Sequence, residues 1–239
     1  MTLSIVIPAR DEARKIERDV QAAGQFLGDH FVAGEIIVVD DGSSDDTADR
    51  ARQTAIPQGI SLIVIRNDRP RGKGFAIRTG MLASHCEYAM FADSGLTVPF
   101  ENALRGMQML KEGTCDMAHG SRKLKQSVIR KRQDWDRRLI SRLFRWTVMH
   151  LMQIPPQLTD TQCGFKIYRG ETARILYGEC VTDGFMFDIE LIVRALRDGL
   201  RIAEFPVEWR CDRDSRLSLM KSPWKILRDL LSIRRTVLR

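Results

Sequence analysis

Short aliphatic runs alternate with polar stretches through the amino-terminal half of the chain. The runs LSIVIPA, GEIIVVDD, SLIVIRN and YAMFAD are each followed by a segment of helical character. Strands that are apolar along their whole length and alternate with helices are typical of a parallel sheet covered on both faces. The pattern therefore predicts an α/β fold with a Rossmann-like, mostly parallel sheet. In such a sheet, ligands bind beyond the carboxyl ends of the strands.

Acidic residues stand at two of those predicted strand ends. Asp40 and Asp41 close the second run, and Asp93 closes the fourth. Two adjacent carboxylates raise each other's pKa unless a base edge, a ribose or a cation compensates their charge. We therefore expect a polar ligand at this edge.

The acids that follow Asp41 have a simpler interpretation. They stand at positions 45, 46 and 49 of the segment GSSDDTAD. Acidic side chains in the first turn interact favourably with the helix dipole, and Ser43 or Ser44 can cap the helix. We expect these acids to start a helix.

Charge is spread unevenly along the 239 residues, although the net charge is +7. Residues 1–60 hold 11 acids and 6 bases, whereas residues 122–145 hold 10 bases and 2 acids. Basic segments attract phosphates, whether in a nucleotide, a nucleic acid or a membrane surface. The five scattered cysteines indicate a reducing cytosol, and the absence of a long apolar run indicates a protein that neither spans a membrane nor carries a secretion signal.

Two basic segments predict amphipathic helices in the second half. LISRLFRWTVMHLM, residues 139–152, places apolar side chains at three- and four-residue spacings, and SPWKILRDLLSIRRTVLR, residues 222–239, interleaves Trp224 and aliphatics with arginines. Such helices either pack with a solvated outer face or lie on an anionic bilayer. The presence of two favours membrane contact.

Eight motifs carry a resemblance to a known family. In chain order they are IPARDE, VVDDGSSDDT, RPRGKGFAIRTGM, FADSGLTVP, HGSR, DTQCGFKIYR, GFMFDIELIVRA and EFPVEWRCDRDSRL. Together they resemble glycosyltransferase family 2, with a GT-A fold, and within it the branch of dolichyl-phosphate β-glucosyltransferase and dolichyl-phosphate mannose synthase.

The resemblance implies one GT-A domain over residues 1–239. Residues 1–122 would be the nucleotide-sugar-binding half, and residues 123–239 the acceptor-binding half with membrane-facing amphipathic helices. The implied activity is an inverting hexosyl transfer from a UDP-glucose or GDP-mannose type of donor to a polyprenyl or dolichyl phosphate. The implied location is peripheral, on the cytoplasmic membrane face, and a separate membrane protein is a further implied partner.

The resemblance also implies roles for individual residues. The nucleotide would contact Pro8, Arg10, Glu12, Asp40, Asp41, Lys73, Asp93 and Ser94. Gly72 and Gly74 would let the backbone approach the ligand closely. The residues implied in catalysis are Asp93, Asp188, Arg122 and Arg216, of which the two arginines stabilise the departing diphosphate. The residues implied in acceptor binding are Asp160, Gln162 and Lys166, in a loop over the acceptor phosphate, together with Ser215.

The metal-binding motif departs from the family pattern. The family usually has Asp-x-Asp, which holds Mg²⁺ or Mn²⁺, whereas this chain has Asp93, Ser94 and Gly95. Asp93 and the diphosphate can suffice as ligands, or another acid such as Asp116 can substitute. Alternatively, basic residues take over the task of the cation, or the protein binds a nucleotide sugar without turning it over.

The alternative transferase functions differ in the chemical group that accepts the sugar. A polyprenyl phosphate is already an anion and needs no general base, whereas a hydroxyl acceptor needs a carboxylate, for which Asp188 and Glu190 are the candidates. A catalytically impaired nucleotide-sugar-binding protein is the third alternative. Nucleic-acid binding is disfavoured because the chain has no recognisable nucleic-acid-binding motif.

Overall fold

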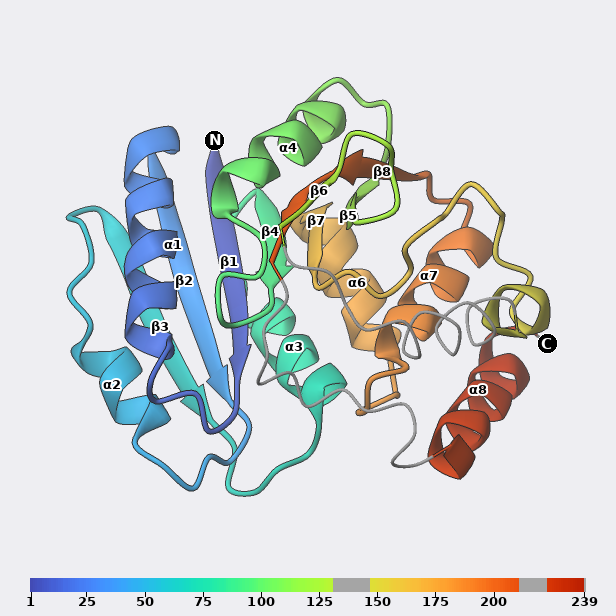
Figure 1. Ribbon diagram of the computed structural model, residues 1–239, viewed down its shortest axis with the longest axis horizontal. Helices are drawn as coiled ribbons and strands as arrows, with labels where there is room; N and C mark the ends of the chain where they lie inside the picture. The colour runs from blue at the N-terminus through green and yellow to red at the C-terminus, as the bar shows by residue number, and fades with distance from the viewer. Residues whose placement is uncertain (131–146, 211–222, 239) are drawn as a thin grey trace.

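The computed structural model describes residues 1–130, 147–210 and 223–238. Within these ranges, seven strands form one sheet in the order β3-β2-β1-β4-β7-β5-β8 (Figure 1). The strands are β1 (Thr2–Ala9), β2 (Ala33–Asp40), β3 (Ile60–Arg66), β4 (Tyr88–Ala92), β5 (Met117–Ser121), β7 (Phe165–Arg169) and β8 (Ile202–Pro206). All run parallel except β7, which is antiparallel between β4 and β5. The predicted mostly parallel α/β sheet is confirmed.

The helices cover both faces of this sheet. They are α1 (Ile16–His30), α2 (Thr47–Gln53), α3 (Lys73–Leu82), the 3₁₀ turn η1 (Phe100–Asn102), α4 (Ala103–Lys111), α6 (Gly170–Glu179), α7 (Phe187–Arg197) and α8 (Pro223–Val237). The buried side chains of α1 and α4 pack on one face, and those of α3, α6 and α7 pack on the other. Because both faces are covered, both sides of each strand can be apolar.

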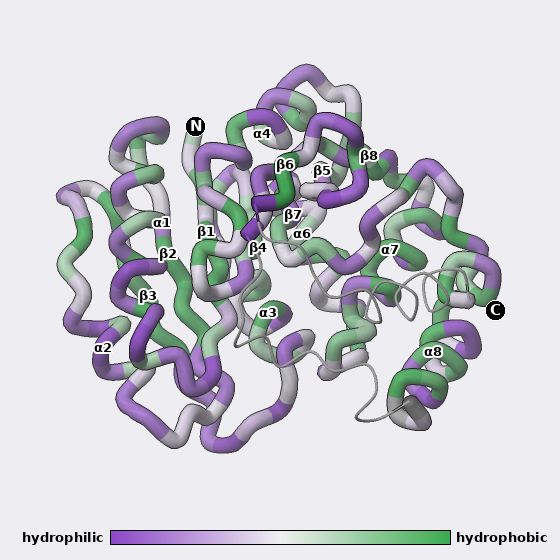
Figure 2. The backbone as a smooth tube through the Cα atoms, in the orientation of Figure 1, coloured by the Kyte–Doolittle hydropathy of each residue, from purple (hydrophilic) through white to green (hydrophobic). Residues whose placement is uncertain are grey.

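Strand β1 shows why its sequence is a continuous apolar run. Leu3, Ile5 and Ile7 belong to the core beneath α1, whereas Val6 belongs to the core beneath α3. Successive strand side chains point to opposite faces, so two cores require two apolar sets in one strand. In Figure 2 the strands carry hydrophobic stretches, and the loops at the lower edge of the view are mostly hydrophilic.

Strand β7 was not predicted. The resemblance puts DTQCGFK in a loop over the acceptor, but its last two residues begin the strand FKIYR, which pairs with both β4 and β5. The interpretation of Lys166 as a loop residue is therefore wrong, since Lys166 lies opposite Phe91 of β4 and His119 of β5.

The helix after the second strand begins later than predicted. Helix α2 starts at Thr47, with Asp46 as the residue before it, so neither Ser43 nor Ser44 caps the helix. The carboxylate of Asp45 accepts a hydrogen bond from the N–H of Thr47 at 3.1 Å. The acids thus support the helix start, as expected, but the serines are free to bond elsewhere.

A third core cluster lies beside the sheet and contains α8. Leu230, Ile233 and Val237 of α8 pack with Ile189 and Ile192 of α7. The predicted carboxyl-terminal amphipathic helix is present and has a buried side. Of the other predicted amphipathic segment, residues 139–146 lie outside the described ranges. A two-stranded ribbon joins β6 (Val128–Ile129) to β9 (Glu208–Trp209).

In the part of the chain that the structure describes, no helix has the length and apolarity needed to cross a bilayer.

Candidate active site

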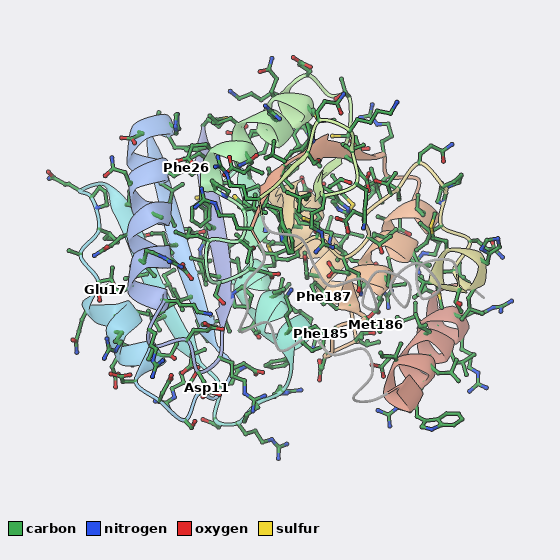
Figure 3. All side chains as sticks on the ribbon, viewed as in Figure 1. Asp11, Glu17, Phe26, Phe185, Met186 and Phe187 are labelled. Carbon is green, nitrogen blue, oxygen red and sulfur yellow. The ribbon has the colours of Figure 1, made fainter. Side chains whose placement is uncertain are left out.

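The carboxyl ends of β1 and β2 bring the first two motifs together. The N–H of Asp11 donates to the hydroxyl of Ser43 at 2.8 Å, and the N–H of Ser44 donates to the carboxylate of Asp11 at 2.8 Å. The N–H of Glu12 donates to the hydroxyl of Thr47, also at 2.8 Å. Figure 3 places Asp11 at the lower edge of the sheet, where these strands end. The loops after β1 and β2 are therefore joined by hydrogen bonds at the edge where a ligand is predicted.

Asp40 is fully buried at the end of β2. Its Oδ1 accepts hydrogen bonds from the N–H and the hydroxyl of Ser43, and the N–H contact measures 3.0 Å. Its Oδ2 lies 3.4 Å from Nε of Arg66 but accepts no hydrogen bond from the described residues. Buried polar atoms are rarely left in this state, so Oδ2 is an acceptor with unused capacity.

Asp41 holds the loop that leads into α3. One oxygen accepts from the side chain of Asn67 at 3.0 Å and from the N–H of Arg71 at 2.8 Å, and the other accepts from the N–H of Gly72 at 2.8 Å. This carboxylate thus has three donors within the protein. The structure places Asp41 at the predicted edge, with its hydrogen bonds directed at the RGKG loop.

The glycines of RGKG let this loop pack closely against the segment that precedes α7. A Cβ at Gly72 would lie 2.4 Å from the carbonyl oxygen of Asp183, and one at Gly74 would lie 2.5 Å from that of Thr182. Gly72 also has a φ of +119°, a conformation that favours glycine. The expectation that these glycines admit a ligand is corrected, because they admit the segment before α7.

Lys73 and Asp93 form an ion pair at the centre of the site. Nζ of Lys73, the first residue of α3, lies 2.6 Å from Oδ1 of Asp93, the residue after β4. The N–H of Asp93 donates to the carbonyl oxygen of Gly164 at 2.9 Å. Burial lowers the pKa of the Lys73 ammonium, but the carboxylates of Asp93 and Asp188 outweigh that effect and leave its pKa raised.

Lys166 and Asp188 form a second, deeper pair. Lys166 is fully buried on β7, and its ammonium donates to Asp188 and to the carbonyl oxygens of Thr161 and Cys163 at 3.2 and 2.9 Å. Burial raises the pKa of Asp188, and the ammonium groups of Lys166 and Lys73 only partly offset the shift. Lys166 therefore fastens the segment before β7 to α7, and its ammonium has no exposed surface.

Arg122 and Asp160 form a bidentate pair. Nε and Nη2 of Arg122 each lie 2.7 Å from one oxygen of Asp160, and the N–H of Arg122 donates to the same carboxylate at 2.9 Å. Burial raises the pKa of Asp160, but the guanidinium of Arg122 outweighs it and leaves the pKa lowered. The guanidinium also lies 5.4 Å from the ring of Trp209. A predicted phosphate-binding residue and a predicted acceptor-binding residue are thus partners.

The other predicted residues lie around these pairs. The side chain of Arg10 is 50% exposed, and the carboxylate of Glu12 lies 3.6 Å from Lys15. Pro8 and Ser94 are partly buried, and the side-chain amide of Gln162 lies 3.5 Å from the carbonyl oxygen of Phe185. Ser215 and Arg216 lie outside the described residues.

Two further candidate acids, Asp116 for the metal and Glu190 for the general base, are bound to other residues. Asp116 pairs with Arg201 at 3.0 Å and precedes β5, so it lies at the edge of the sheet opposite Asp93, and its suggested substitution for the second acid is wrong. Glu190 is fully buried, and it accepts from the N–H of Thr182 at 2.8 Å and pairs with Arg194 at 2.8 Å. These contacts give Glu190 a structural role in fastening the segment before α7.

Asp19 is a buried acid that the sequence interpretation missed. It lies on α1, is 1% exposed, and accepts a hydrogen bond from the N–H of Gly95 at 2.5 Å. A signal was present, because Asp19 falls three residues after Ile16 and four before Ala23, on the apolar stripe of an amphipathic helix. An acid at such a position is buried beside a partner.

Comparison with known families decides the membership of the chain. The family model described as "Glycosyl transferase family 2" matches residues 4–174. The chain belongs to glycosyltransferase family 2. Among solved structures, this family 2 chain is similar to glucosyl-3-phosphoglycerate synthase from Mycobacterium tuberculosis, with a TM-score of 0.71 and 22% identity over 97% of this chain and 79% of that one. This likeness shows the fold, which is the expected GT-A fold.

Curated relatives of the family 2 chain are similar over nearly its whole length. Human dolichyl-phosphate beta-glucosyltransferase is 31% identical over 97% of this chain and 74% of the relative. The Saccharomyces cerevisiae protein of that name is 28% identical, with the same coverage. Glycosyltransferase AglD of Haloferax volcanii is 29% identical over 99% of this chain, which spans 36% of AglD. The branch suggested by the eight motifs is confirmed.

Asp93 is the residue at which the sequence predicts a divalent cation. The mycobacterial synthase has been crystallised with Mn²⁺ and UDP-glucose. In this chain, no group of three or more His, Cys, Asp and Glu side chains gathers as a metal site among the described residues. Asp93 offers one carboxylate, and the ammonium of Lys73 already binds it. Asp93 therefore supplies a single carboxylate ligand, and a Mg²⁺ or Mn²⁺ ion held there would need oxygens of the diphosphate and water for its remaining positions.

Proposed function

We propose that this family 2 chain is an inverting hexosyltransferase that moves the sugar of a nucleoside diphosphate sugar to a polyprenyl phosphate. The observation that carries the proposal is the pairing of cations with acids at the carboxyl edge, Lys73 with Asp93 and Arg122 with Asp160. Relatives similar over nearly the whole chain are named dolichyl-phosphate beta-glucosyltransferases, which supports the acceptor class.

The nucleotide is proposed to lie against the ends of β1 and β2. Asp40 supports this, because its buried Oδ2 has an unused acceptor position. Arg10 is half exposed at the same edge and can contact the nucleotide, as can Pro8 and Glu12. Asp41 acts through the RGKG loop that it holds, rather than by a free carboxylate.

The reaction is a single displacement at the anomeric carbon. An oxygen of the acceptor phosphate forms the new bond to that carbon, while the bond from the carbon to the donor's β-phosphate oxygen breaks. The electron pair leaves with the nucleoside diphosphate, and the configuration inverts. Stabilising the negative charge on this leaving group is the largest electrostatic demand. We assign it to Lys73 and Arg122, with Arg216 as a further candidate.

The Mg²⁺ or Mn²⁺ ion expected at Asp93 enters this proposal as a competitor of Lys73. The ammonium lies against Oδ1 of Asp93, so a cation that binds this carboxylate has to displace that positive charge or lie close to it. Ser94 follows Asp93 in the loop and can contact the diphosphate.

The phosphate acceptor is favoured over a hydroxyl acceptor. A hydroxyl needs an accessible general base, whereas Asp188 is 3% exposed and is bound by the ammonium of Lys166. A phosphate needs positive charge and alignment. The segment that contains Asp160 and Gln162 would supply the alignment, with Lys166 holding that segment, and basic residues of the second half would supply the charge.

We further propose that α8 lies on a membrane surface, where the lipid acceptor resides. Trp224, Leu227 and Leu231 stand three and four residues apart and are 81%, 41% and 38% exposed. Arg228 and Arg235 line the same shallow groove. Apolar side chains flanked by arginines suit an anionic bilayer, with bases at the phosphates. The chain would then be peripheral on a cytoplasmic membrane face.

The test is incubation of the purified protein with a panel of nucleotide sugars and short polyprenyl phosphates. We expect a sugar-bearing lipid phosphate from a UDP- or GDP-linked hexose, separated by chromatography. Lack of product with every donor, while nucleotide binding persists in calorimetry, would instead support a nucleotide-sugar-binding protein.

A further inference from the structure

The loop that carries Asp93 is held at three points by three different parts of the protein. The N–H of Asp93 donates to Gly164 before β7, and the N–H of Arg210 after β9 donates to the carbonyl oxygen of Thr97 at 2.8 Å. Between them, the N–H of Gly95 donates to the carboxylate of Asp19 on α1. Asp19 supplies the one side chain among these three anchors.

Burying a carboxylate costs free energy, so the presence of an aspartate at this position requires an explanation. Asp19 is 1% exposed, and its second oxygen lies 3.5 Å from Arg18, whose side chain is 59% exposed. An isolated buried charge with one good hydrogen bond destabilises a fold relative to an apolar side chain. An apolar residue would therefore serve the core better, but it would leave the N–H of Gly95 without an acceptor.

The backbone at Gly95 explains why the anchor comes from outside the loop. Gly95 has a φ of +89°, and the next residue, Leu96, has a φ of +48°. A positive φ is ordinary for glycine but uncommon for leucine, and it persists at Leu96 only where the surroundings impose it. The acid that the family pattern has at position 95 is missing here, and a carboxylate from α1 binds the main chain at that position.

We propose that Asp19 is a positioning residue that fixes the path of loop 93–97 and so sets the place of the Asp93 carboxylate beside Lys73. The proposal rests on the proposed transferase function, in which Lys73 stabilises the leaving diphosphate. Asp19 touches neither substrate nor the reacting atoms, and it acts through Gly95. The distance of 2.6 Å between Lys73 and Asp93 depends on where this loop runs.

The experiment compares Asp19→Leu with Asp19→Asn in the full chain. Leucine is close to aspartate in shape and suits a buried site, but it accepts no hydrogen bond. Asparagine keeps an acceptor for Gly95. Glu17→Leu is the control, because Glu17 is exposed on the same turn of α1 (Figure 3). Transfer kinetics are measured on folded protein, together with exchange of the Gly95 amide hydrogen by NMR.

We expect Asp19→Leu to lower kcat by about ten- to a hundredfold, since small misplacements near a reacting centre have effects of that size. Its KM for the lipid acceptor should stay unchanged, and its Gly95 amide should exchange faster. Asp19→Asn should restore slow exchange and bring kcat to within about threefold of the parent, as one retained hydrogen bond allows. Glu17→Leu should match the parent in all three measurements.

Two results would overturn the inference: a parental kcat in Asp19→Leu, or an Asp19→Asn variant as impaired as Asp19→Leu. If the parent protein transfers no sugar, the proposed function fails, and the amide exchange still reports the anchor. In that case, unchanged exchange of the Gly95 amide in Asp19→Leu would reject the anchoring role independently.

Discussion

The buried charge of Asp19 has a consequence for stability that one substitution isolates. Burial raises the pKa of Asp19 from 3.8 to about 6, against the lowering effects of the Gly95 N–H and the Arg18 guanidinium, while Glu12 adds to the rise. Asp19→Asn replaces the titratable carboxyl group by a neutral amide, whose oxygen can still accept the hydrogen bond from the N–H of Gly95. The folded protein should therefore gain stability at neutral pH.

The size and the sign of this change in the free energy of unfolding follow from the linkage between proton binding and folding. Between pH 3.8 and about 6 the folded state binds the Asp19 proton more tightly than the unfolded state does, so stability falls as pH rises through that window. A shift of about 2 units corresponds to about 3 kcal/mol, because one pKa unit is about 1.4 kcal/mol. The advantage of Asp19→Asn over the parent should grow by up to that amount between about pH 4 and pH 8.

Urea denaturation at several pH values between these limits measures the difference directly. Glu17→Gln on the same helix is the matched control, and its difference from the parent should not follow this profile. An Asp19→Asn difference that stays constant over the whole pH range would refute the reasoning. It would mean that Asp19 titrates alike in the folded and unfolded chain.

Four further variants test the site and its surroundings. Lys73→Met should lower kcat about a hundredfold and tighten Mn²⁺ binding, as titration calorimetry and activity with added Mn²⁺ would show, because the ammonium stabilises the leaving group and competes for the same carboxylate. Arg122→Gln should cost about 3 kcal/mol in urea denaturation, since it leaves a buried carboxylate without its partner. Gly74→Ala should cost about 2 kcal/mol in the same assay, because the added Cβ would meet a carbonyl oxygen at 2.5 Å. Replacing Trp224 and Leu231 by alanine should weaken sedimentation with anionic vesicles by about tenfold or more, with unchanged binding of nucleotide in solution.

Much of the first half could be predicted from the sequence because its strands are apolar throughout. The runs LSIVIPA, GEIIVVDD, SLIVIRN and YAMFAD became β1 to β4, which end at Ala9, Asp40, Arg66 and Ala92. Their parallel pairing then fixes which ends share an edge, so the neighbourhood of Asp40 and Asp93 followed from topology alone. These inferences needed no information on individual side-chain contacts.

The partners of each charged residue could not be predicted in the same way. FKIYR is short and contains a lysine, so nothing local distinguishes a central strand from a loop. Lys166 is buried because Asp188, on α7, and two carbonyl oxygens surround its ammonium. Contacts between segments 22 residues apart depend on the assembled fold, and they decide whether a lysine is accessible to a ligand.

The pairing of acids with bases explains how the cations of the proposed diphosphate site can be buried before a substrate arrives. Lys73 is balanced by Asp93, and Arg122 by Asp160, which is 5% exposed. An unpaired cation in such places would destabilise the fold by several kcal/mol. In the proposed reaction, a donor diphosphate that replaces Asp93 at the ammonium exchanges one anion for another, so the charge of the ammonium stays compensated throughout. The exchange also frees the Asp93 carboxylate, and loop 93–97 must then hold it within reach of Lys73 for the next cycle, which is the task inferred for Asp19.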